Sequence, residues 1–197
     1  KTPYIAGIDL AGEDEQAPQS LDDMRALCTA RNDKRARDST VITIAELNSY
    51  PLHTTRYPLI RVVEQYCWTG TAHSQLYPHM VNILNKWNCH RIIVDATGMG
   101  QPVASFLRRE LGSRVIPFTF TSKSKSSLGF ELLSFINSGR LTLYKQDGSP
   151  EYQETLFELE RARAQYHPNQ TMNFFVDPSE GHEDFLMSLP LVVYGGK

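Results

Sequence analysis

The segment Arg91–Asp95 constrains the fold of this chain most, because a run of β-branched residues stops there at a carboxylate. Residues 97–100 are rich in glycine and break the run, so the pattern predicts a buried strand with Asp95 at its C-terminal end. Open α/β sheets place binding and catalytic groups at this end of their strands. The alternative is that Asp95 caps a helix beginning near Gln101.

The same pattern occurs a second time near the start of the sequence. Residues 4–9 form an apolar run that stops at Asp9, and Gly12 follows shortly afterwards. Two strands that each end in an aspartate predict one shared site.

Length and composition predict a single packed domain. The chain has 197 residues, of which 41% are hydrophobic, and this is ample for one core. No run approaches the roughly 18 apolar residues of a membrane span, and no signal peptide opens the sequence. The chain has three cysteines, Cys28, Cys67 and Cys89, and none of them has CxxC spacing. Their odd number and their spacing disfavour a disulfide framework and a thiolate zinc site. A reducing cytoplasm is the simplest interpretation.

The overall charge carries no nucleic-acid signature. A formal net charge of -2 and a pI near 6.3 count against a basic binding surface. Carboxylates that bind divalent cations would themselves lower the charge of the metal-free chain, so the charge leaves a nucleic-acid substrate open.

Hydrophobic periodicity predicts an alternating order of strands and helices. Strands are expected at 4–10, 39–47, 59–68, 91–95, 114–120, 140–144 and 171–176. Helices are expected at 76–87, about 101–111, 122–139, 150–165 and 185–189, with a polar surface loop at 13–38 that includes a short helix at 21–30. The first two strands should pair as neighbours, and the β-α-β-α-β order from residue 59 favours a parallel layer with right-handed crossovers.

Three further groups of polar residues lie at predicted helices. Lys123 and Lys125 begin the helix at 122 among several hydroxyls, which suits phosphate contact, or else forms a solvated serine-rich cap. Glu183 and Asp184 begin the last helix, where they either cap it or add a third acidic group to the strand-end aspartates. The helix at 150–165 is expected to turn Leu156, Leu159 and Ala162 inward and to expose Glu158, Glu160, Arg161 and Arg163 to solvent.

These motifs together resemble the nuclease domain of the tailed-phage terminase large subunit. The resemblance spans Ile5 to Leu189 and rests on the order of the motifs: the strand ending at Asp9 with its β-hairpin, 94–100, the Ser124-Lys125-Ser126 helix start, 138–141 and 182–189. The family usually carries His-Asp-Asp where this chain has His182-Glu183-Asp184, so the match is kept at Asp184. No GxxxxGK[ST] phosphate loop is present in the sequence.

The resemblance implies an α/β RNase H-like fold, a mixed central sheet flanked by helices. It implies that residues 1–197 are a single nuclease domain, excised from the C-terminal part of a protein with an N-terminal packaging ATPase. The expected activity is a metal-dependent DNA endonuclease that cuts concatemeric viral DNA in the host cell cytoplasm. The implied partners are double-stranded DNA, the ATPase domain, the portal and the small terminase subunit, with no membrane.

The resemblance also implies the site. Phosphodiester hydrolysis adds negative charge to an anionic centre, and two divalent cations about 3.5–4 Å apart can activate water and stabilise the leaving oxygen. Mg²⁺ or Mn²⁺ would take carboxylate oxygens, with Asp9 bridging both ions, Asp95 on one and Asp184 on the other. Lys125 and Lys123 would contact DNA, and His182 could orient Asp184 or a water.

Two alternatives remain open from the sequence. One is another RNase H-like nuclease of the junction-resolvase or transposase type. The other is a catalytically silent module that docks on DNA or the portal and whose carboxylates are only helix caps.

Overall fold

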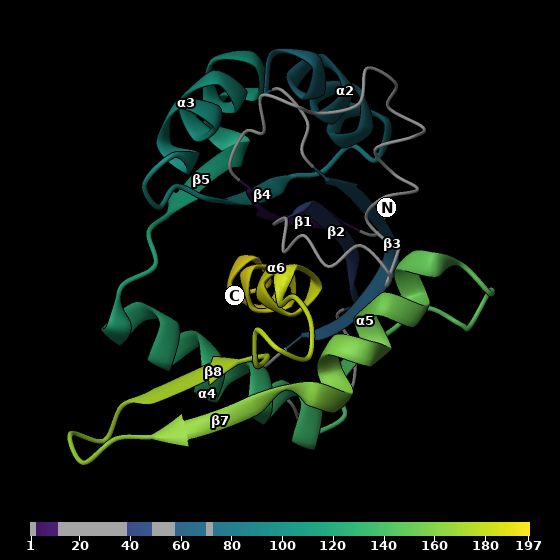
Figure 1. Ribbon diagram of the computed structural model, residues 1–197. Helices are drawn as coiled ribbons and strands as arrows, with labels where there is room; N and C mark the ends of the chain where they lie inside the picture. Colours follow the sequence, from purple (N-terminus) through teal and green to yellow (C-terminus); the bar gives the residue numbers. More distant parts are fainter. Residues whose placement is uncertain (1–2, 12–38, 49–57, 70–72) are drawn as a thin grey trace.

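The computed structural model describes residues 3–11, 39–48, 58–69 and 73–197 (Figure 1). The predicted loop at 13–38, with its short helix, lies outside the described residues. The elements in chain order are β1 (Tyr4–Asp9), β2 (Ser39–Asn48), β3 (Leu59–Thr69), α2 (His73–Lys86), β4 (Arg91–Asp95), α3 (Gly100–Leu111), β5 (Val115–Phe118), α4 (Ser122–Asn137), β6 (Leu141–Thr142), α5 (Pro150–Arg161), β7 (Arg163–Tyr166), β8 (Met172–Phe175) and α6 (Asp184–Gly195).

A six-stranded mixed sheet with the order β5-β4-β1-β2-β3-β6 forms the centre of the fold. Strand β1 pairs antiparallel with β2, as predicted, and parallel with β4. Strands β4 and β5 are parallel neighbours. Strand β3 pairs antiparallel with β2. It therefore runs in the same direction as β1 and β4, but β1 and β2 lie between it and β4. The predicted mixed sheet is confirmed.

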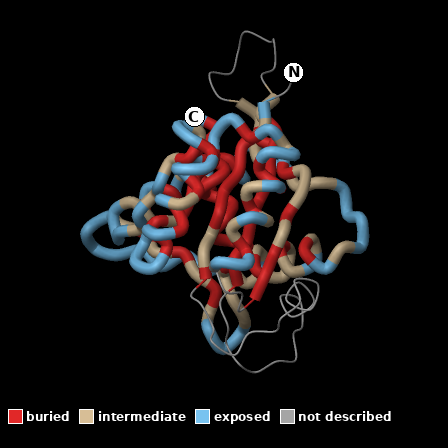
Figure 2. Tube along the Cα trace, turned by 90° about the horizontal axis from the view of Figure 1, so that it is seen from above, coloured by how far each residue is buried: buried red, intermediate tan, exposed pale blue. Residues whose placement is uncertain are grey.

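Helices cover both faces of this sheet. Helices α2 and α3 lie on one face, whereas α6 lies on the other, with α4, α5 and the β7–β8 hairpin outside it (Figure 1). Each face has its own apolar core, and buried residues fill the centre of the molecule (Figure 2). Within the described residues, no helix is long and apolar enough to cross a membrane.

Helix α6 runs against β1 in close contact because Gly7 has no side chain. A Cβ added to Gly7 would lie 2.5 Å from the carbonyl oxygen of Ser188. A Cβ on Gly195 would lie 3.9 Å from the Cβ of Ile5, earlier on the same strand. The helix is therefore antiparallel to β1, and its first residue, Asp184, lies at the C-terminal end of that strand.

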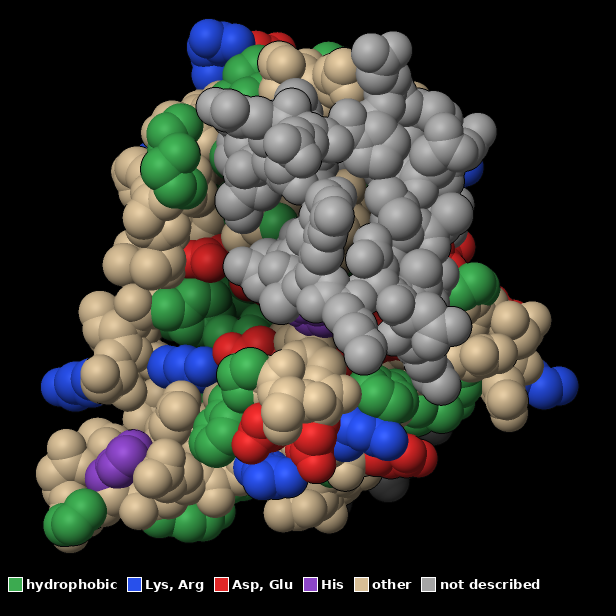
Figure 3. All heavy atoms as spheres, viewed as in Figure 1, with side chains coloured by type: hydrophobic (Ala, Val, Ile, Leu, Met, Phe, Trp, Pro, Cys, Tyr) green, Lys and Arg blue, Asp and Glu red, His purple; other side chains and the backbone are tan. Residues whose placement is uncertain are grey.

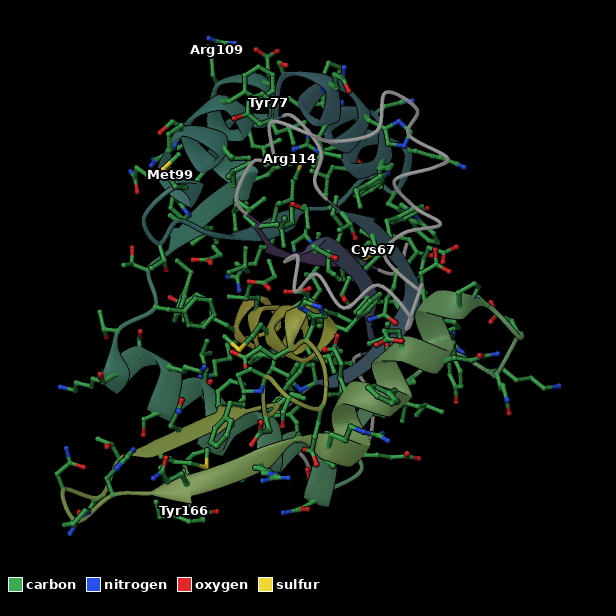
Figure 4. The ribbon with its side chains drawn as sticks, in the orientation of Figure 1. Cys67, Tyr77, Met99, Arg109, Arg114 and Tyr166 are labelled. Carbon is green, nitrogen blue, oxygen red and sulfur yellow. The ribbon has the colours of Figure 1, made fainter. Side chains whose placement is uncertain are left out.

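The segment at 150–165 differs from its prediction. Helix α5 ends at Arg161, Ala162 is exposed with an extended backbone, and residues 163–166 form strand β7. Strand β7 pairs antiparallel with β8 in a separate two-stranded sheet, and Tyr166 lies exposed on it (Figure 4). The exposed, mostly polar β7 sequence has no apolar periodicity, so its strand conformation depends on pairing with β8.

The cysteines also differ from expectation. Cys67, which is labelled in Figure 4, takes part in a disulfide, and the odd cysteine count did not predict this. Cys89 is free and buried. Burial raises the pKa of the Cys89 thiol to about 12, and Cys89 packs within the core on the α2 and α3 side of the sheet.

A buried chain of hydrogen bonds connects α5 to α6 through two strands. The Thr155 hydroxyl donates to Oε1 of Gln65 at 2.7 Å, and Nε2 of Gln65 donates to the Thr43 hydroxyl at 3.0 Å. The Thr43 and Ser188 hydroxyls are 2.6 Å apart. Gln65, Thr43, Thr155 and Ser188 are all fully buried, so this network fixes α5 relative to α6.

We expect Gln65→Leu to lower the free energy of unfolding by about 2 kcal/mol, because buried hydroxyls lose a partner and regain no water. Urea denaturation measures the change, with the exposed Gln153→Leu on α5 as the control. Equal stability of the two variants would show that the network contributes nothing.

Candidate active site

Asp9 and Asp95 end neighbouring parallel strands. Strands β1 and β4 pair from Ile5↔Arg91 to Ile8↔Val94, so the next residues in this register are Asp9 and Asp95. The two strand-end carboxylates therefore share one end of the sheet, as their sequence pattern predicts. Burial raises the pKa of Asp95, and hydrogen bonds from Thr97 oppose the shift.

Asp95 does not cap the following helix. Its Oδ1 accepts a hydrogen bond from the Thr97 amide at 2.8 Å, within the turn that follows β4. Helix α3 begins at Gly100, and its N-cap residue is Met99, which makes no side-chain cap. Met99 lies on this turn with 67% of its surface exposed (Figure 4). The capping alternative for Asp95 is therefore wrong.

Asp184 approaches the same end of the sheet from α6. Only 8% of its surface is exposed, and its Oδ2 accepts a hydrogen bond from the Ser39 amide at 2.9 Å. Ser39 begins β2, and two residues further on Val41 pairs with Asp9. The contact between Ser39 and Asp184 thus places the start of α6 beside the ends of β1 and β2.

Glu158 is a fourth acidic residue beside this site, and its sequence interpretation as a solvated residue is wrong. It is 1% exposed, and its Oε2 accepts a hydrogen bond from the Leu186 amide at 2.7 Å. Burial holds its pKa well above the ordinary value, and the Asp184 and, more weakly, Asp9 carboxylates add to the shift. Glu158 therefore lies within electrostatic reach of both aspartates.

One signal in the sequence could have identified Glu158. The buried residues of α5 are Glu151, Thr155 and Glu158, which are spaced i, i+4 and i+7 and so share one helical face. A polar stripe at that spacing looks solvated when only hydrophobicity is scored. Its regular spacing is the one sign that it forms a buried polar face.

The two lysines begin α4 as predicted. Thr121 and Ser124 form a capping box there, so the hydroxyls do serve as a cap. Lys123 is exposed, whereas the Lys125 ammonium lies 3.2 Å from Oε1 of Glu183. Figure 3 shows Lys and Arg interspersed with Asp and Glu on the face that includes the hairpin.

Glu183 has a structural role and does not cap α6 with its side chain. It is the N-cap residue of α6 but makes no side-chain cap. Its Oε2 accepts a hydrogen bond from the Val176 amide at 3.1 Å, while Oε1 binds Lys125. Glu183 therefore connects α4 and the end of the hairpin to the start of α6, and the capping alternative for it is wrong.

The donor set fits hard divalent cations. Asp9, Asp95 and Asp184 offer carboxylate oxygens, which Mg²⁺ and Mn²⁺ prefer. Among the residues that the structure describes, no ready group of three or more His, Cys, Asp or Glu side chains is arranged to hold a metal ion. A shared ion would therefore require these side chains to rotate toward it.

Comparison with solved structures identifies similar folds. The large terminase nuclease from thermophilic phage G20c with bound magnesium has 17% identity and a TM-score of 0.67, over 98% of this chain and 81% of that one. The cobalt-bound form of the same nuclease has 17% identity and a TM-score of 0.66, over 98% of this chain and 81% of that one. The Thermus phage P74-26 large terminase nuclease domain has 15% identity and a TM-score of 0.62, over 97% of this chain and 78% of that one. At these identities, the likeness shows the fold alone.

Sequence comparison shows the family. No curated protein matches the chain. The family model of the terminase RNase H-like domain matches residues 31–167, which is more than half of the chain and includes Asp95 and Lys125 but neither Asp9 nor Asp184. This chain therefore belongs to the terminase RNase H-like domain family, and its fold is that of the phage large terminase nucleases.

Proposed function

We propose that this domain is a metal-dependent endonuclease that cuts concatemeric viral DNA during genome packaging. The observation that supports the proposal is that the strands ending in Asp9 and Asp95 and the helix that begins with the buried Asp184 all reach the same end of the sheet. In the infected host cytoplasm the domain would act as part of a larger protein with a packaging ATPase. The portal and the small terminase subunit would be its further partners.

In the proposed site, two Mg²⁺ or Mn²⁺ ions would be held by three carboxylates: Asp9 would be shared by both ions, Asp95 would hold one and Asp184 the other. Bound ions would activate a water and stabilise the charge on the leaving oxygen. Asp9 and Asp95 project from strands, and Asp184 from a helix fixed against β1 at Gly7, so the backbone holds the ligands in place. The nuclease of phage G20c was solved with bound magnesium and with bound cobalt, which supports divalent ions here.

Cleavage of supercoiled plasmid with Mn²⁺ or Mg²⁺ tests this proposal. Metal-dependent nicking or linearisation, abolished by EDTA, is the expected result. A domain that binds DNA and never cuts it would instead be a docking module. Faster cutting of branched than of linear DNA would favour a resolvase-type nuclease.

We expect Lys125→Ala to weaken DNA binding and cleavage by the loss of one phosphate contact. Lys125 is held by Glu183 at the start of α6, beside the proposed metal ligands. Losing one contact should flatten the slope of log affinity against log salt by about 0.9. With a net charge of -2, the isolated domain should need low salt or high protein concentration to cut.

The control for this experiment is Lys86→Ala, which removes an exposed lysine at the end of α2 on the opposite face of the sheet. Lys123→Ala, in the same first turn of α4, tests the second predicted contact. Salt curves of Lys125→Ala that superimpose on those of the wild type would remove this lysine from the site.

A further inference from the structure

We propose that Glu158 is a positioning residue that holds the first turn of α6, and with it Asp184, in the geometry required for metal binding. This inference rests on the proposed function. It concerns a residue on α5 that touches the helix carrying Asp184, and it assigns Glu158 no direct contact with metal or DNA.

The first step is the capping of α6. The first four amides of a helix have no acceptor within the helix, and the N-cap Glu183 supplies no side-chain cap. Glu158 supplies one from another element, because its Oε2 accepts from the Leu186 amide at 2.7 Å. Leu186 is two residues beyond Asp184, so this bond fixes the backbone turn from which the Asp184 side chain projects.

The second step is the rigidity of α5. One turn before Glu158, the Thr155 hydroxyl joins the buried network that reaches Ser188 on α6 through Gln65 and Thr43. Helix α5 therefore holds α6 at two points, and Glu158 provides the one nearer the metal site. Removing its acceptor would loosen the end of α6 that carries Asp184 and leave the Ser188 attachment intact.

The third step is the cost of placing an acid there. A carboxylate that is 1% exposed beside Asp184 is unfavourable, because burial and like charge both oppose ionisation. An amide of the same length would accept the same hydrogen bond from Leu186 without that charge. The function of the hydrogen bond can therefore be separated from that of the charge by substitution.

The decisive comparison is Glu158→Ala against Glu158→Gln, with the exposed Glu160→Ala on the same helix as the control. Loss of a residue that orients a metal ligand without binding the metal itself typically costs 10–100-fold in metal affinity or activity. We therefore expect Glu158→Ala to raise the Mn²⁺ midpoint of plasmid cleavage by at least about 10-fold. Glu158→Gln and Glu160→Ala should stay close to the wild type.

Two readouts do not depend on cleavage. The rise of Tm caused by Mn²⁺ should be smaller for Glu158→Ala than for the wild type, and should be retained in Glu158→Gln. In the metal-free protein, the Leu186 amide should exchange with deuterium faster in Glu158→Ala only. Should Glu158→Ala not fold, Glu158→Asp keeps the charge but withdraws the acceptor, and it should also raise the Mn²⁺ midpoint.

Several outcomes would overturn this inference. An equal loss in Glu158→Gln and Glu158→Ala would show that the carboxylate itself takes part, and wild-type midpoints in Glu158→Ala or Glu158→Asp would show that the hydrogen bond does not matter. Each of these leaves the nuclease proposal standing. A wild-type domain that neither cuts DNA nor gains Tm from Mn²⁺ would instead overturn the proposed function and this inference together.

Discussion

Asp9→Asn should lower the rate of DNA cleavage by about 10³-fold or more, because metal ions contribute several kcal/mol of transition-state stabilisation and each 1.4 kcal/mol is a factor of ten. The Tm of the metal-free protein should be unchanged or higher. Asp9 is one of the carboxylates whose charge raises the pKa of Glu158, so neutralising it relieves like-charge repulsion. Plasmid cleavage and thermal denaturation without metal measure the two effects.

The control for Asp9→Asn is Asp147→Asn, which changes a solvent-exposed aspartate between β6 and α5. It should cut DNA at the wild-type rate. Asp95→Asn should reproduce the effect of Asp9→Asn, because both residues are proposed as ligands. Loss of folding in place of loss of cutting would favour a structural role for these aspartates.

Gly7→Ala should lower the free energy of unfolding by about 3 kcal/mol, at the upper end of the usual cost of overpacking. A Cβ at this position would lie 2.5 Å from the carbonyl oxygen of Ser188 and 2.9 Å from the amide nitrogen of Val192. Both are backbone atoms of α6, so the helix itself must move. For a domain of this size, the Tm should fall by about 6–12 °C.

The control for Gly7→Ala is Gly196→Ala, just beyond the end of α6. There the new Cβ would meet the terminal methyl groups of Ile60 at 2.7 Å and Leu47 at 3.1 Å, which can move at smaller cost. Gly196→Ala should therefore be the less destabilised variant. A displaced α6 would also move Asp184, so Gly7→Ala should cut DNA more slowly even well below its Tm. Wild-type stability in Gly7→Ala would contradict the close packing of α6 on β1.

The sequence alone determined where the six strands of the central sheet lie and that two of them, β1 and β4, end in an aspartate. A run such as Arg91–Asp95 indicates a local preference for the extended backbone and burial on both faces of the sheet. Both properties can be recognised from residues that are neighbours in the sequence. Local pattern is therefore sufficient to place Asp9 and Asp95 at the ends of strands. The order of the motifs also identified the terminase nuclease resemblance, which the family match confirms.

Only the tertiary structure decided how α5 and α6 relate to the sheet. Periodicity assigned Glu158 to solvent, because a charged residue on a helix is normally solvated. Its burial depends on an amide of α6 that is 28 residues away in sequence. The placement of Asp184 likewise depends on contacts of its helix with Gly7 and of its carboxylate with Ser39. Local patterns cannot specify such partners, because each one is supplied by a distant segment that packs against the residue only in the folded chain.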